Sequence, residues 1–105
     1  MNTKKSTKSL ALLESISGKK LTIGNLLWAL RECEQITQVA FAKQLNISRQ
    51  YLCDLEHNRR GLSPDMAAKF AQQLGHSEEQ FIRLALQDAL DRAGLPFNVE
   101  IKRAA

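Results

Sequence analysis

Two adjacent residues of this 105-residue chain, Arg49 and Gln50, have side chains suited to reading the edges of nucleic-acid bases. Arg forms paired hydrogen bonds with guanine, and Gln does the same with adenine. Tyr51 and Asp54 follow closely, and all four residues are candidates for base contacts. On an isolated helix, exposed polar residues of this kind are usually only solvated surface. The local structure must therefore decide between the two interpretations.

The flanking residues predict two short helices joined by a tight turn. Thr37 and Gln38 begin the first helix, and it should end at Asn46, since Asn tolerates the left-handed conformation of a helix C-cap. Ser48 can cap a second helix that begins at Arg49. A stop, a short gap and a start is the pattern of a helix-turn-helix, whose second helix contacts bases with its first turn. This position favours the base-reading interpretation.

The stretch from about Leu21 to Leu84 resembles the lambda-repressor and Cro-like helix-turn-helix domain, also called the XRE family. The resemblance is carried by TQVAFAKQLNIS, SRQYLCDLEHNRRG and the run to AQQLG, and it covers roughly two thirds of the chain. The family usually has Gly in the turn and after the helix that ends in Glu56, where this chain has Asn46 and Asn58. Asn also adopts left-handed backbone. The resemblance implies an all-α, five-helix DNA-binding domain.

The resemblance also implies roles for side chains around the second helix. In the family, a Gln at the position of Gln38 touches a phosphate and braces the first base-reading residue. An Arg at the position of Arg31 pairs with the acid at Glu56, which ties two helices together. Charged loops beside the DNA backbone supply affinity but no sequence information. The expected phosphate contacts are Thr37, Gln38, Lys43, Ser48, Arg59 and Arg60. For Lys43 and the two loop arginines, an ordinary basic surface is the alternative.

Three more helices are expected, at residues 22–34, 64–74 and 78–93. Leucines recur at three and four residues in the first, which predicts one buried stripe. Ser63 and Pro64 are typical of a helix start, and Gly75 of a helix end. The third begins with a capping box and stops before a Gly and a Pro.

Both ends of the chain lie outside this expected domain, which spans residues 21–93. Residues 1–20 are a basic arm in which a short extra helix is expected. Such an arm either follows DNA phosphates or only solubilises the chain. Residues 94–105 form a tail whose segment 97–101 alternates apolar and polar side chains, as a strand does.

The last expected helix carries a wider apolar surface than a minimal domain of the family needs, which indicates a second partner. An isolated strand after it would leave its backbone groups unpaired. Together these features predict a homodimer, the alternative being that the tail packs on its own domain. A two-fold dimer would place two reading helices about 34 Å apart on an inverted repeat of double-stranded DNA. The expectation is a transcriptional repressor. An antitoxin that binds a toxin protein and its own operator is the alternative.

Composition and the remaining reactive side chains limit other functions. A formal net charge of +4 modestly favours polyanions. The sequence has no apolar run of bilayer length and no secretory signal, so we expect a cytoplasmic protein. The cysteines and histidines lack the spacing of a metal site, so neither a metal nor a cofactor is expected. No catalytic arrangement or phosphate-binding Gly loop is found, so we do not expect an enzyme.

Overall fold

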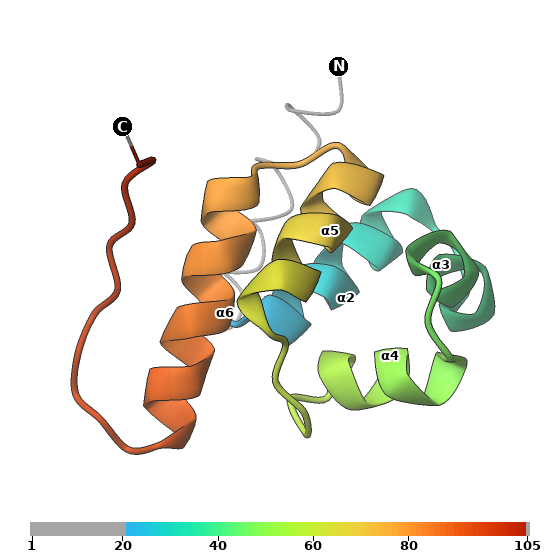
Figure 1. The fold of residues 1–105 in the computed structure, drawn as a ribbon. Coiled ribbons are helices and arrows are strands. Elements are labelled where there is room, and N and C mark those ends of the chain that lie inside the picture. Colours follow the sequence, from blue (N-terminus) through green and yellow to red (C-terminus); the bar gives the residue numbers. More distant parts are fainter. Residues whose placement is uncertain (1–20, 105) are drawn as a thin grey trace.

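The computed structural model describes residues 21–104, and these residues fold into five α-helices without a strand (Figure 1). The helices are α2 (Ile23–Glu34), α3 (Gln38–Leu45), α4 (Arg49–Glu56), α5 (Pro64–Leu74) and α6 (Glu78–Arg92). This confirms the expected all-α, five-helix domain, with helix bounds close to those expected. The short extra helix expected within residues 1–20 lies outside the described residues.

Each helix begins with a hydroxyl side chain that satisfies a free backbone N–H group. Oxygens of these five caps accept hydrogen bonds over 3.0–3.4 Å. The capping residues are Thr22, Thr37, Ser48, Ser63 and Ser77. Ser48 and Ser63 were expected in this role from the sequence, because Ser and Thr favour this position.

The two asparagines that replace family glycines adopt left-handed backbone. Asn46 has a φ of 60° and ends α3, and Asn58 has a φ of 59° in the loop after α4. The replacement therefore leaves the turns unchanged, as expected from the tolerance of Asn for this conformation. A third residue, Gln35, ends α2 in the same way with a φ of 57°, and this cap was not predicted from the sequence.

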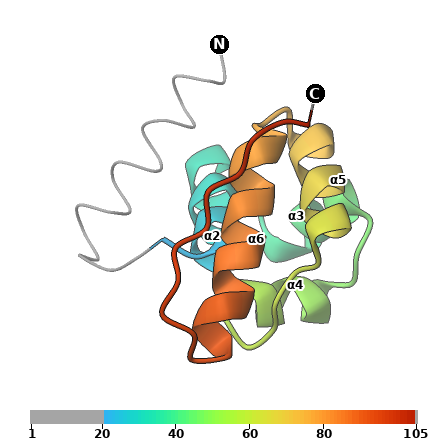
Figure 2. The same cartoon turned by 60° about the vertical axis from the view of Figure 1, so that its left-hand side comes forward.

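The core lies between α2, α4, α5 and α6, with α3 closing one end. α5 and α6 lie side by side, and α2 packs against both α4 and α6 (Figures 1 and 2). Leu52 and Leu55 of α4 are completely buried in this core beside Leu27, Phe41 and Phe70. Because these two leucines fix one face of α4 inward, its opposite face is directed outward.

The tail after α6 is extended but does not form the expected strand. It runs back along α6 (Figure 2). The buried side chain of Gln87 donates to the Phe97 carbonyl oxygen over 2.9 Å and accepts from the Val99 N–H over 2.8 Å. A single side-chain amide thus supplies the pairing that a neighbouring strand would give. The tail lies against its own domain and leaves Leu95 and Phe97 exposed.

None of the described helices is both long and apolar enough to cross a membrane.

Candidate nucleic-acid interface

The first turn of α4 carries the two residues whose chemistry suits base reading. Ser48 caps this helix by accepting from the Tyr51 N–H over 3.1 Å. Arg49 and Gln50 are exposed, whereas Tyr51 and Asp54 are partly buried. Arg49, Gln50 and Asp54 therefore lie on or near the outer face, whereas Tyr51 packs partly against the core. This arrangement can present hydrogen-bonding groups to the floor of a groove.

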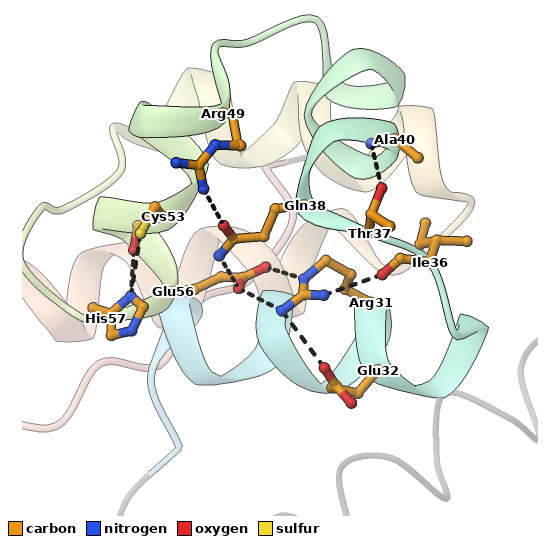
Figure 3. A network of polar contacts seen from close by, with 10 residues as sticks. All are labelled: Arg31, Glu32, Ile36, Thr37, Gln38, Ala40, Arg49, Cys53, Glu56 and His57. Carbon is orange, nitrogen blue, oxygen red and sulfur yellow. Dashed lines mark hydrogen bonds and ion pairs between the residues drawn. The ribbon is translucent and has the colours of Figure 1, made fainter.

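A paired arginine and glutamate hold the other end of α4 against α2 (Figure 3). Arg31 donates from Nε to Glu56 Oε2 over 2.8 Å and from Nη2 to Oε1 over 3.0 Å. The side chains of Arg31 and Glu56 are only 12% and 2% exposed. Arg31 also donates to the Ile36 carbonyl oxygen over 3.1 Å. The ion pair expected from the family is formed, and its bidentate geometry suits a planar guanidinium.

Gln38 links this buried pair to the first base-reading candidate (Figure 3). Its Nε2 donates to Glu56 Oε1 over 3.0 Å, and its Oε1 accepts from Arg49 Nη1 over 3.0 Å. A carboxylate only accepts and a guanidinium only donates, so this orientation of the Gln38 amide follows from its partners. The chain of contacts Arg31–Glu56–Gln38–Arg49 therefore runs from the interior to the exposed tip of α4.

A second cluster lies in the middle of α4 and involves the following loop. Asp54 Oδ1 accepts from Gln50 Nε2 over 3.1 Å and from Arg59 Nε over 3.0 Å, and Arg59 Nη2 lies 2.9 Å from the same oxygen. The hydrogen bond from Arg59 holds the pKa of the Asp54 carboxyl below its usual range, so the group is charged at neutral pH. Arg60 lies over the Tyr51 ring, 4.4 Å from its centre.

The structure places the expected phosphate contacts in different settings. Thr37 and Ser48 cap α3 and α4, where exposed N–H groups and the helix dipole favour anions. Lys43 is exposed on α3. Arg59 and Arg60 instead contact side chains of α4, a feature that the sequence did not reveal because both arginines read as an exposed basic loop.

Gly24 and Asn58 were missed as residues that position α4. A Cβ at Gly24 would collide with the Leu55 carbonyl oxygen, so the α2 and α4 backbones meet directly here. Asn58 accepts from Thr22 Oγ1 over 2.7 Å and donates to Asn25 Oδ1 over 2.9 Å. A Gly inside a helical pattern is a signal of close packing that could have identified the first contact. The partners of Asn58 are more than 30 residues away and gave no local signal.

Among residues 21–104, no group of three or more Cys, His, Asp or Glu side chains is placed to hold a metal ion. Cys53 and His57 approach each other, with 3.6 Å between Sγ and Nδ1 (Figure 3). Two ligands fall short of the four that a structural zinc site uses. His57 Nδ1 also lies 2.8 Å from the Cys53 carbonyl oxygen, which is typical of a residue that closes the end of a helix.

Comparison with known proteins gives one match. Residues 24–87, more than half of the chain, match the family model of a helix-turn-helix domain. Neither the search of curated proteins nor that of solved structures returned a match. The matched segment extends from α2 into α6 and contains both side-chain clusters of α4.

Proposed function

This chain belongs to the helix-turn-helix domain family, and from that premise we propose that it is a cytoplasmic, sequence-specific transcriptional repressor. It binds an inverted-repeat operator as a homodimer, with one α4 helix in each of two successive major grooves. Arg49 and Gln50 read bases with help from Tyr51 and Asp54. The caps of α3 and α4, together with Gln38, Lys43 and Arg60, contact phosphates.

One observation carries this proposal: the exposed Arg49 at the first turn of α4 is braced by Gln38, which is itself held by a buried ion pair. Ordering the side chain of a surface arginine costs conformational entropy, and a surface contact of this kind contributes little free energy in return. An ordered guanidinium offers two parallel donors to guanine at no further ordering cost. The brace therefore supports base reading.

The proposal is tested by selecting bound sequences from a pool of random duplexes. We expect an enriched inverted repeat whose half-site centres lie one helical turn apart, about 10 base pairs. The matched variant Arg49→Ala/Gln50→Ala should stay folded, since both residues are exposed, and should lose that preference. If the folded double variant selects the same sequences as the wild type, α4 is not the reading helix.

The dimer is supported by exposed apolar side chains of the tail. Leu95 and Phe97, which follow α6, are 46% and 63% exposed. Sedimentation equilibrium at micromolar concentration should give a dimer, and Phe97→Ser should shift it toward monomer. If the wild-type protein is a monomer and still protects a full inverted repeat, dimerisation is contradicted but DNA binding by α4 is not.

An antitoxin function is the second candidate, and the same exposed side chains favour it. A toxin protein could cover Leu95 and Phe97 in place of a second copy. The two candidates differ in what accompanies the purified chain. A small unrelated protein that co-purifies in fixed ratio, and is lost with Phe97→Ser, would favour the antitoxin.

A further inference from the structure

One acidic side chain lies on the face of α4 that is proposed to meet DNA. α4 contains two acids, Asp54 and Glu56, and Glu56 is buried against Arg31. The side chain of Asp54 is 27% exposed. A carboxylate at this position repels phosphate and lowers affinity for every duplex. The neighbouring contacts of Asp54 explain how the interface tolerates it.

Arg59 directs two nitrogens at the same Asp54 oxygen, over distances of 3.0 and 2.9 Å. Its Nη2 also lies 3.5 Å from Cys53 Sγ, so the guanidinium is folded back onto α4. A guanidinium neutralised in this way releases no counterion from DNA and adds no phosphate contact. The charge of Arg59 is therefore neutralised by Asp54 within the protein.

The next residue provides a contrast. Arg60 lies over the Tyr51 ring at 4.4 Å, a contact that orders the guanidinium without cancelling its charge. Arg60 remains able to contact a phosphate, whereas Arg59 would have to leave a carboxylate first. Two adjacent arginines of one loop thus have different electrostatic settings.

We propose that Asp54 holds Arg59 away from the DNA backbone and thereby limits binding to duplexes that lack the operator sequence. This inference rests on the proposed function. A released Arg59 would reach phosphates of any sequence, because phosphate contacts carry no sequence information. The closed Asp54–Arg59 pair lowers affinity for all duplexes, while the operator recovers affinity through base contacts. The pair therefore limits binding to duplexes in which no base contacts compensate for the missing phosphate contact.

The test measures binding to the selected operator and to a mixed-sequence duplex by fluorescence anisotropy over a series of salt concentrations. Asp54→Asn keeps an oxygen that accepts from Gln50 and removes the negative charge that holds Arg59. We expect the plot of log affinity against log salt to steepen by about 0.9, the value for one added phosphate contact. Affinity for the mixed-sequence duplex should rise about five- to tenfold at about 0.1 M salt. The slope for the operator should steepen by the same amount, because the added contact is to a phosphate.

Arg59→Gln distinguishes this inference from a direct phosphate contact. In the wild-type background, Arg59→Gln should leave the salt slope unchanged. In the Asp54→Asn background, it should return the slope to the wild-type value. Glu79→Gln removes the same charge from α6, which packs mainly against α5, and should leave the slope unchanged.

Two results would overturn the inference. In one, Arg59→Gln alone flattens the slope while Asp54→Asn leaves it unchanged. In the other, Glu79→Gln gives the same gain as Asp54→Asn. Failure of the proposed function is seen separately, as a wild-type protein that prefers no duplex over the mixed-sequence pool.

Discussion

The two arginine–carboxylate pairs of α4 have the same chemistry and different surroundings. Arg31 and Glu56 are 12% and 2% exposed, whereas Arg59 and Asp54 are 53% and 27% exposed. A buried charge that loses its partner is costly, whereas solvent and salt weaken an exposed pair. We therefore assign the first pair to the position of α4 and the second to the charge of the surface that α4 presents. Each of the following variants tests that division.

Arg31→Ala should have the largest effect on stability, because it leaves the Glu56 carboxylate buried without a counter-charge. We expect a loss of roughly 3–5 kcal/mol of unfolding free energy. Thermal denaturation should show this as a fall in melting temperature of more than about 10 °C. Arg103→Ala removes the same charge from the exposed tail and should leave the melting temperature near that of wild type. A change of only a degree or so for Arg31→Ala would contradict the structural role of the pair.

Gly24→Ala should have the next largest effect, through the backbone rather than through charge. The added methyl group would collide with the Leu55 carbonyl oxygen and push α4 away from α2. We expect a cost of about 1–3 kcal/mol, as for an overpacked core, measured by urea denaturation. Gly61→Ala is the matched control, because a Cβ there meets only ordinary contacts at 3.5 Å or more. Equal stability of the two variants would mean that α2 and α4 can separate freely.

Gln38→Met should separate stability from sequence preference. It retains the side-chain length but removes both hydrogen bonds, to Glu56 and to Arg49. We expect a loss of about 1 kcal/mol in stability. The effect on sequence preference should be larger: in a duplex competition assay, discrimination at the base that Arg49 is proposed to contact should weaken. An unchanged preference would show that Arg49 needs no brace.

Arg59→Gln should change stability least among the charge variants, since both members of its pair are partly exposed. We expect a melting temperature close to that of wild type at every salt concentration. A marked fall in melting temperature would show that this pair also stabilises the fold, and the contrast with Arg31 and Glu56 would be lost.

His76 belongs to neither pair and gives the smallest effect. Burial against Phe81 lowers the pKa of His76 from its ordinary value of 6.5, and Glu34 partly opposes this shift. The unfolded chain then binds the proton more readily, so this stability contribution is present above pH 6.5 and is lost as pH falls toward the folded pKa. His76→Gln should flatten the dependence of melting temperature on pH in this range. An identical pH profile in both proteins would contradict it.

Much of the fold could be predicted from single residues and their neighbours. The capping residues and the turn asparagines act over three or four positions, and the structure has them where the sequence predicts. The strand expected in the tail was wrong because alternation of side chains records only a local period. The side chain of Gln87, ten residues before Phe97, determined how that segment pairs.

In the candidate site, too, some features could be predicted from the sequence and others could not. The types and order of Arg49, Gln50 and the leucines behind them are properties of the sequence, as is the pair that the family resemblance implied for Arg31 and Glu56. Only the tertiary structure showed that Arg59 is directed at Asp54. It also showed that Gln38, whose brace on Arg49 the resemblance implied, donates to the buried Glu56.

The sequence by itself determined where helices begin and end and which face of α4 is apolar, since caps and hydrophobic period depend on residues within one or two turns. The tertiary structure alone decided which charges remain free to act on DNA. A charged side chain can reach several partners, and the fold selects among them by bringing distant residues within about 3 Å.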